Sequence, residues 1–174
     1  SNEKELQNID IVYTSNCVRT LQTAKYLLEK QNLKVNIDER FDERRPGKPN
    51  SDKVPDWYER QFFDENYKTE GGESQVEVRQ RMSEAFEEVV KDNKGKRIAI
   101  FSHGNAITFF LLKWCKLESV NINRNLCLSF NNKIVFNKRI NSPDVFKITL
   151  NNKNEVIDIE NIEFEDLDFD DFNK

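Results

Sequence analysis

Apolar residues in the first forty positions change their spacing from that of a strand to that of a helix and back. The apolar run within residues 10–14 predicts a short buried strand. Residues 17–30 follow as an amphipathic helix, with Ser15 and Asn16 as suitable N-cap residues. The apolar positions of this helix are Val18, Leu21, Ala24 and Leu28. Alternating apolar positions in residues 34–38 predict a second strand.

Residues 39–72 interrupt this regular pattern. The segment holds three of the four prolines and three of the five glycines, and it carries aromatic residues that include Trp57, Tyr58 and Phe62. A long connection with aromatic side chains is more typical of a lid or binding loop than of a linker. We expect a short helix around residues 56–66.

Regular patterns return in the second half of the chain. They predict a helix over residues 74–92, a buried strand over 96–102 and a strongly apolar helix over 105–115. Four short strands are expected after them: Leu126–Phe130, Ile134–Phe136, Phe146–Leu150 and Val156–Ile159. The pairs Asn131-Asn132 and Asn151-Asn152 suit tight turns between these strands.

This order of elements predicts the α/β class, because strands and helices alternate before a small meander. We expect a single domain over residues 1–174, built as a three-layer sandwich. Helices would cover both faces of a mixed, mainly parallel sheet, with a small C-terminal β extension. Residues 160–174 are rich in Asp and Glu and predict an acidic tail, solvated or loosely docked.

Charge and cysteine content narrow the function classes. The 27 basic and 31 acidic residues leave a net charge of −4, which argues against a nucleic-acid partner. Three cysteines without C-x-x-C spacing indicate a reduced protein. The chain shows no signal-peptide pattern, and its longest apolar run is too short to span a bilayer. We therefore expect a cytoplasmic protein without a membrane partner, while the oligomeric state stays open.

The strongest candidate for chemistry is His103, the one histidine in the sequence. It follows a buried strand and precedes an apolar helix, where backbone N–H groups and the positive end of the helix dipole favour anions. Gly104 beside it lets the backbone approach a ligand closely. Arg19 also stands just beyond a strand end, where a guanidinium suits a phosphate. Read alone, each residue could instead be an ordinary structural or surface side chain.

Two loop segments are weaker candidates. Glu43 lies in Asp-Glu-Arg-Arg-Pro-Gly, where a carboxylate among arginines stays ionised unless burial raises its pKa. Residues 71–74, Gly-Gly-Glu-Ser, could form a simple turn and helix cap, or a nest of N–H groups for an anion.

Other chemistries do not fit the sequence. A cysteine-based phosphate loop would need Arg where Gln22 stands after Cys17. The sequence has no G-x-S-x-G elbow and no GxxxxGK[ST] loop. A single histidine disfavours a zinc site with histidine ligands.

The candidate segments occur in a fixed order within residues 9–115. They are the strand with Ser15, Arg19 and Gln-Thr-Ala in residues 11–24, the acidic loop at 42–47, Gly-Gly-Glu-Ser at 71–74 with Arg79, and Phe-Ser-His-Gly-Asn at 101–105. Together they resemble the motifs of the histidine phosphatase superfamily, the phosphoglycerate mutase-like enzymes. The agreement in order is more specific than any one motif.

The resemblance implies hydrolysis of a small phosphorylated substrate through a phosphohistidine, without metal or cofactor. Arg19 would bind the phosphoryl group, His103 would stabilise its oxygens, and Glu43 would protonate the leaving oxygen. The residues implied in substrate contact are Ser15, Arg44, Glu73, Ser74, Gly104 and Asn105. A mutase activity is the alternative, although the short loop at 39–72 is closer to the phosphatase branch.

The printed sequence departs from the family in one respect: it contains no Arg-His-Gly motif. The resemblance places that motif, with the nucleophilic histidine, on a first strand in the middle of the sheet. We expect the domain here to lack this strand and its helix, through truncation or through natural loss, and the printed chain to be inactive. A non-catalytic module that binds a phosphorylated ligand is the rival function.

Overall fold

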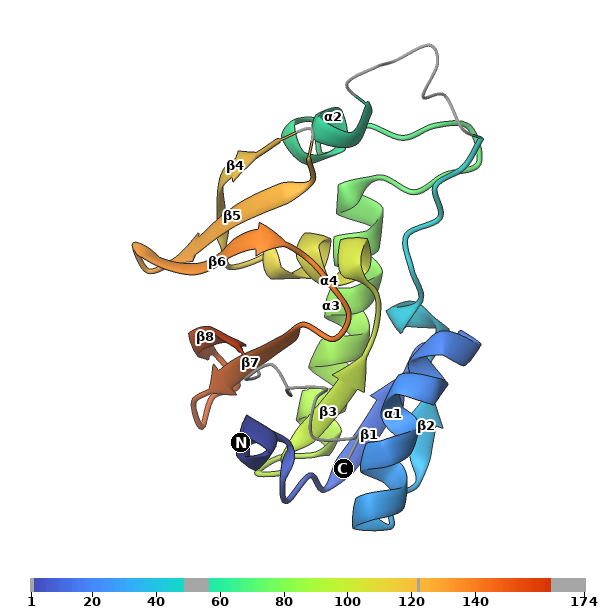
Figure 1. Ribbon diagram of the computed structural model, residues 1–174, viewed down its shortest axis with the longest axis vertical. Helices are drawn as coiled ribbons and strands as arrows, with labels where there is room; N and C mark the ends of the chain where they lie inside the picture. Colours follow the sequence, from blue (N-terminus) through green and yellow to red (C-terminus); the bar gives the residue numbers. More distant parts are fainter. Residues whose placement is uncertain (1, 49–56, 122, 164–174) are drawn as a thin grey trace, which may run out of the picture.

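The computed structural model describes residues 2–48, 57–121 and 123–163. A three-stranded parallel sheet lies at the centre of the α/β part, in the order β2–β1–β3 (Figure 1). The strands are β1 (Ile11–Thr14), β2 (Val35–Ile37) and β3 (Ile98–Phe101). The helices are α1 (Val18–Gln31), α2 (Trp57–Phe63), α3 (Gln75–Asp92) and α4 (Gly104–Leu111), with short 3-10 helices η1 (Asn2–Leu6) and η2 (Glu39–Phe41).

Helices cover both faces of the parallel sheet, as predicted. Successive side chains of a strand point to opposite faces. Val12 of β1 and Ala99 of β3 therefore pack in the cluster that contains Ala24 of α1. Their neighbours Tyr13 and Ile100 pack in the larger cluster, which is built on α3 and α4.

Aromatic rings hold the larger cluster together. Phe109 of α4 is completely buried and meets Phe62 of α2 edge-on, with ring centroids 5.3 Å apart. Phe110 packs against Phe86 of α3 and against Trp114. The strongly apolar sequence of α4 is thus explained by its burial between α2, α3 and the strands that follow.

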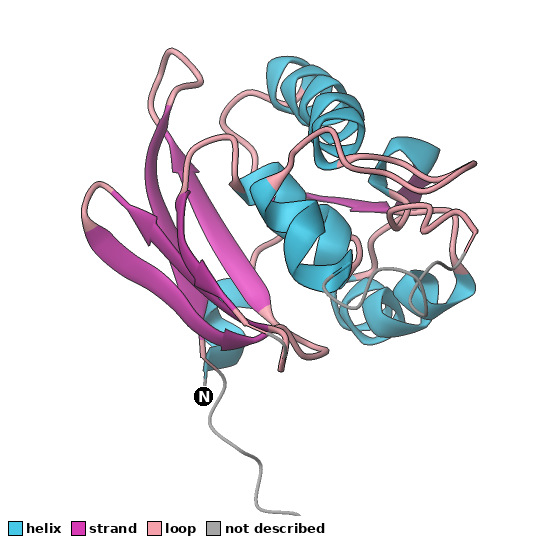
Figure 2. Ribbon diagram, turned by 90° about the horizontal axis from the view of Figure 1, so that it is seen from above, coloured by secondary structure: helices cyan, strands magenta, loops and turns pink. Residues whose placement is uncertain are grey.

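The remaining strands form two antiparallel sheets, which lie on one side of the helices (Figure 2). One has the order β4–β5–β6 and the other pairs β7 with β8. Their bounds are β4 (Lys116–Val120), β5 (Asn125–Phe130), β6 (Lys133–Arg139), β7 (Val145–Leu150) and β8 (Val156–Ile162). The α/β class with a C-terminal β extension is confirmed, but the parallel and antiparallel strands belong to separate sheets, and β4 was not predicted.

Several local predictions need correction. The N-cap of α1 is Cys17 rather than Ser15 or Asn16, and α4 ends at Leu111 rather than at residue 115. The turn at Asn131-Asn132 is confirmed, since both residues have positive φ as a tight reversal requires.

The second turn is longer than the pair Asn151-Asn152. Asn151 accepts hydrogen bonds from the backbone of Lys153 and Glu155, and Asn154 takes the positive φ. The acidic tail also begins later than predicted, because residues 160–162 belong to β8. Residues 164–174 lie outside the described residues.

Within the described ranges, no helix is both long and apolar enough to cross a membrane.

Candidate active site

The carboxyl ends of β1 and β3 bring two of the predicted residues into contact. Thr14 is paired with Phe101 in the sheet, and the backbone N–H of Ser15 donates to the carbonyl of Phe101 at 3.0 Å. Ser15 and His103 therefore leave the same sheet edge side by side. His103 also occupies the N-cap position of α4.

Hydrogen bonds define the protonation of His103. Thr20 Oγ1 donates to the carbonyl of Cys17 at 2.7 Å, so the Ser15 hydroxyl donates to Thr20 Oγ1 at 2.8 Å. Ser15 Oγ then accepts the proton on His103 Nε2, also at 2.8 Å. Arg19 Nε donates to His103 Nδ1 at 2.9 Å, which requires a lone pair there. The ring is consequently neutral, with its proton on Nε2.

The surroundings keep this imidazole neutral. Burial and, to a smaller extent, the charge of Arg19 lower the pKa of His103, Asp42 opposes them, and the net value is about 4. Asp42 itself accepts a hydrogen bond from the backbone N–H of Asn16 at 2.7 Å. In the absence of a ligand, His103 is thus a neutral group beside the cation of Arg19.

We expect the His103 imidazole to titrate near pH 4 in the ligand-free protein. Because the unfolded chain protonates its histidine near pH 6.5, the unfolded state binds the proton more tightly. The free energy of unfolding should therefore fall as pH decreases from 6.5 to 4, by about 3 kcal/mol from this group. Proton NMR can follow the ring directly, because the sequence has one histidine.

The variant Arg19→Gln should raise that pKa, since it removes the nearby positive charge. Lys25→Gln is the matched control on the same helix, because Lys25 is exposed and pairs with Glu29. A pKa near 6.5 in the unmodified protein would contradict the described environment.

Glu43 reaches the site from the loop after η2. Its Oε1 accepts from the backbone N–H of Arg44 at 2.9 Å and from that of Ala106, in the first turn of α4, at 3.1 Å. The structure describes no partner for Oε2. The carboxylate is thus held at the helix N-terminus beside His103, with one oxygen left for a ligand.

The other loop residues hold the segment that carries Glu43. Glu73 binds Arg81 through both carboxylate oxygens, at 2.9 and 3.1 Å, and accepts the backbone N–H of Arg45. Burial alone would raise the pKa of Glu73, but the bond to Arg81 and the other donors lower it overall. Arg44 is buried and donates its Nε to the backbone carbonyl of Glu73. These contacts fix the loop against α3.

Gly-Gly-Glu-Ser takes the turn-and-cap form. Ser74 is the N-cap of α3 and shares a capping box with Glu77. A Cβ on Gly72 would lie 2.9 Å from the carbonyl oxygen of Pro46, so only glycine lets the two loops pack this closely. A contact of Glu73 or Ser74 with substrate remains a prediction.

Gly104 and Asn105 form the first turn of α4, beside His103. A methyl group of Ile140 lies 3.4 Å from the position that a Cβ on Gly104 would take. Asn105 is half-buried next to it. Both are placed where a ligand at His103 could meet them, and their contact with one remains a prediction.

Sequence reasoning missed three residues of this arrangement: Thr20, Asp42 and Arg81. Arg81 lies on α3, but Glu73 precedes the N-cap of that helix, so helical periodicity does not relate the two residues and no sequence pattern indicated their pairing. The motif-based choice, Arg79, instead binds Gln75 and Glu65.

A groove of about 920 Å³ extends from the site along the parallel sheet. β3 forms one wall, with Ile98 and Ile100, and β7 contributes Phe146 and Ile148 opposite. His103 and Arg19 stand at one end. Among the described strands, β3 pairs only with β1 and β7 pairs only with β8, so each of these two groove-lining strands has one unpaired backbone edge.

No group of three or more His, Cys, Asp or Glu side chains in the described part of the chain could hold a metal ion. The side chains at the site are instead the neutral imidazole of His103 and the guanidinium of Arg19, and these hydrogen-bond donors suit an anion.

Comparison with known proteins identifies the family that this chain matches. Residues 3–134 match the family described as the histidine phosphatase superfamily (branch 1). No curated protein sequence matches the chain.

Several solved structures share the fold. A mycobacterial glucosyl-3-phosphoglycerate phosphatase complexed with VO3 is 21% identical, with 73% of this chain and 72% of that chain covered and a TM-score of 0.58. YhfR of Bacillus stearothermophilus is 19% identical, with 80% of each chain covered and a TM-score of 0.55. A mutant phosphoserine phosphatase from Entamoeba histolytica, in complex with phosphoserine, is 19% identical, with 79% of each covered and a TM-score of 0.52.

Proposed function

The chain belongs to the histidine phosphatase superfamily (branch 1), and on that premise we propose that its site serves the hydrolysis of small phosphomonoesters through a phosphohistidine. The observation that carries the proposal is the convergence of Arg19, His103 and Glu43 at the carboxyl edge of the parallel sheet. A guanidinium, an imidazole and a carboxylate with a free oxygen are the groups that phosphoryl transfer requires.

The proposed chemistry proceeds in two displacements. The nitrogen of a nucleophilic imidazole attacks phosphorus, the ester P–O bond breaks, and Glu43, which must enter this step protonated on Oε2, gives that proton to the leaving oxygen. Glu43 then takes a proton from water, the water oxygen attacks phosphorus, and the P–N bond breaks to release inorganic phosphate.

Arg19 and His103 act on the charge of the phosphoryl group. The terminal nitrogens of Arg19 have no partner among the described residues and can bind its oxygens. A dianionic group beside His103 favours the protonated ring, because an adjacent negative charge raises the pKa of a base. Protonation on Nδ1 would end its bond with Arg19 Nε and free that nitrogen for the phosphoryl group, and the imidazolium would stabilise the oxygens as phosphorus changes partners.

His103 is poorly suited to be the nucleophile itself. Both ring nitrogens are engaged, Nδ1 with Arg19 and Nε2 with Ser15. We propose that the nucleophile is carried by a further strand in the groove between β3 and β7. Such a strand would pair with the free edge of β3 and end beside His103.

Anion binding tests the phosphoryl site. Inorganic vanadate or phosphate should bind to the printed chain, and the double variant Arg19→Ala, His103→Ala should weaken binding at least about tenfold. Added salt should weaken binding to the unmodified chain, since Arg19 is exposed.

Isothermal titration calorimetry can measure both effects. Lys25→Ala is the control, because it removes one positive charge from the same helix without touching the site. Equal binding by the unmodified chain and the double variant would refute the assignment of the phosphoryl site.

A further inference from the structure

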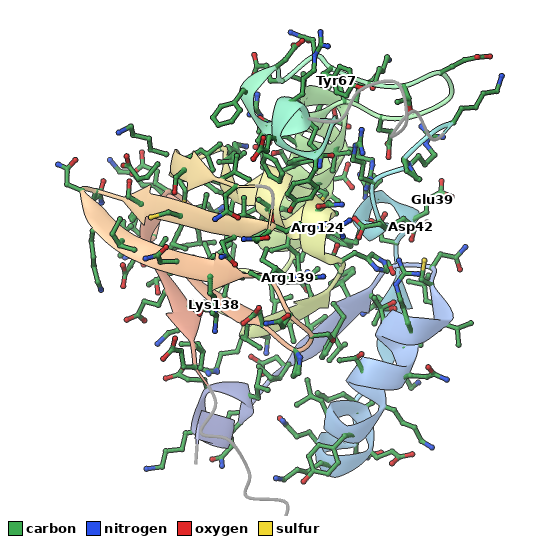
Figure 3. All side chains as sticks on the ribbon, turned by 45° about the horizontal axis from the view of Figure 1, so that its top comes forward. Glu39, Asp42, Tyr67, Arg124, Lys138 and Arg139 are labelled. Atoms are coloured by element: carbon green, nitrogen blue, oxygen red, sulfur yellow. The ribbon has the colours of Figure 1, made fainter. Side chains whose placement is uncertain are left out.

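Two arginines lie together at one end of the β4–β6 sheet. Arg139 is the last residue of β6 and is paired in register with Asn125, the first residue of β5. Arg124 directly precedes Asn125 and has a positive φ of 64°. Figure 3 shows the two arginines near one another, with Lys138 farther back along the strand.

Neither arginine has an ion-pair partner in the described part of the chain, whereas their neighbour does. Lys138 binds Asp144 at 3.2 Å and Glu163 at 3.8 Å. Because successive residues of a strand point to opposite faces, Arg139 is directed away from these carboxylates. Two guanidinium groups held close without a counter-charge repel one another, and a bound anion would remove that cost.

Tyr58 of α2 lies beside Arg124. The Arg124 guanidinium stacks over its ring, 5.1 Å from the centroid. Burial raises the pKa of the Tyr58 hydroxyl, and the charges of Arg124 and Arg139 oppose that rise, as their proximity requires. The stacked ring restrains Arg124, so less side-chain entropy is lost when it binds a ligand.

The pair of arginines is connected to the active site through adjacent residues. A methyl group of Ile140, which follows Arg139, lies 3.4 Å from the position that a Cβ on Gly104 would take, next to His103. On the other side, Tyr58 packs on Phe62, and Phe62 packs on Phe109 of α4. Figure 3 shows Asp42, which borders His103, across from the two arginines.

The same helix, α2, also carries a buried amide. Gln61 is completely buried, yet neither its Oε1 nor its Nε2 has a hydrogen-bond partner. Buried polar side chains nearly always form hydrogen bonds, so the amide of Gln61 is an exception. Gln61 stands three residues after Tyr58, which places both side chains on one face of the helix.

From these observations we propose that Arg124 and Arg139 form a second anion subsite, which binds a carboxylate or second phosphate at the far end of the substrate. The substrate would then be a phosphomonoester with two anionic ends. Its phosphoryl end would lie at Arg19 and His103, and for that end alone the inference rests on the proposed function.

Binding of non-hydrolysable ligands tests the subsite on the printed chain. The ligands are ω-phosphonocarboxylates and α,ω-bisphosphonates with two to eight methylenes, and alkylphosphonates of the same lengths serve as single-anion controls. At one or two lengths, a second anionic end should tighten binding about tenfold. Tighter binding of the phosphonocarboxylates would identify the second anion as a carboxylate, and tighter binding of the bisphosphonates would identify it as a phosphate.

The double variant Arg124→Gln, Arg139→Gln should lose this tenfold gain and bind alkylphosphonates unchanged. Lys138→Gln should keep the gain, because it removes an adjacent charge that is already neutralised. Gln61→Met should raise the melting temperature, since it removes unsatisfied buried polar atoms.

The outcomes separate the two proposals. No gain from a second anion at any length, or a gain that survives the double arginine variant, would overturn the subsite. If alkylphosphonates do not bind, but the ligands with two anionic ends bind and lose binding in the double arginine variant, the phosphoryl site is overturned and the subsite stands.

Discussion

Phosphatase activity should rise by at least about 10⁴-fold when the chain is extended by a strand that ends in Arg-His-Gly, because removal of a catalytic nucleophile costs that much or more. The printed sequence offers one imidazole, and both of its nitrogens are engaged. Arg19 and Glu43 could still polarise a bound ester, so a small residual rate is expected without the strand.

The measurement is hydrolysis of para-nitrophenyl phosphate by both versions of the protein. The extended version should also show burst kinetics and an acid-labile, alkali-stable phosphoenzyme, which are the marks of a phosphohistidine. Its melting temperature should rise, because the added strand pairs the free edge of β3 and fills the groove beside Ile100 and Phe146.

The matched control is the same added strand with asparagine in place of its histidine. It should restore the melting temperature without restoring activity. Equal activity of the printed and extended chains would show that another residue carries the chemistry. Restored stability without activity in the histidine version would favour a non-catalytic module that binds a phosphorylated ligand.

Replacement of Arg81 should cost about 3 kcal/mol of unfolding free energy, because it leaves the buried carboxylate of Glu73 with only the exposed side chain of Arg45 as an ion-pair partner. Arg81 binds both oxygens of Glu73 and also donates to the backbone carbonyls of Arg40 and Glu43. Arg81→Met removes these bonds while it keeps much of the aliphatic side chain.

Chemical denaturation with Arg79→Met as the matched control measures this effect. Arg79 lies on the same helix, and its ion pair with Glu65 is largely exposed on the carboxylate side, so its loss should cost no more than about 0.5 kcal/mol. Equal losses of unfolding free energy in the two variants would mean that the pair of Arg81 and Glu73 does not hold the loop.

The pH dependence of this pair has a defined sign. The folded protein lowers the pKa of Glu73, so the stability from its ionised form is present above the pKa in the unfolded chain. That stability is lost as pH falls through the lower folded value. Arg81→Met should remove this acid-dependent component, and unchanged acid sensitivity would contradict the assignment to Glu73.

The residues that follow strand ends could be placed from the sequence. A buried apolar run followed by a helical pattern indicates where each parallel strand stops, and parallel strands stop at a common edge. Ser15, Arg19 and His103 follow such ends, and the structure brings them within hydrogen-bond distance. Local periodicity carries this information because each element depends mainly on its own neighbours in sequence.

The position of Glu43 against α4 could not be derived in this way. Its carboxylate meets the backbone of Ala106, 63 positions later in the chain, and the loop that carries it is held by Arg81. Neither contact has a periodic signature across the intervening segments. Only the packing of η2 and the loop against α3 and α4 decides them.

The strands, like the site residues, could be predicted only in part from the sequence. The sequence indicated most of the strands by their apolar runs, but β4 escaped because its alternation includes the charged Lys116 and Glu118. Which edges pair, and which stay free, depends on contacts between distant segments. The sequence by itself therefore determined the order of the elements and the residues at their ends. Only the tertiary structure decided the separate sheets, the groove between β3 and β7, and the cluster of Arg124 and Arg139, because these arise from non-local packing.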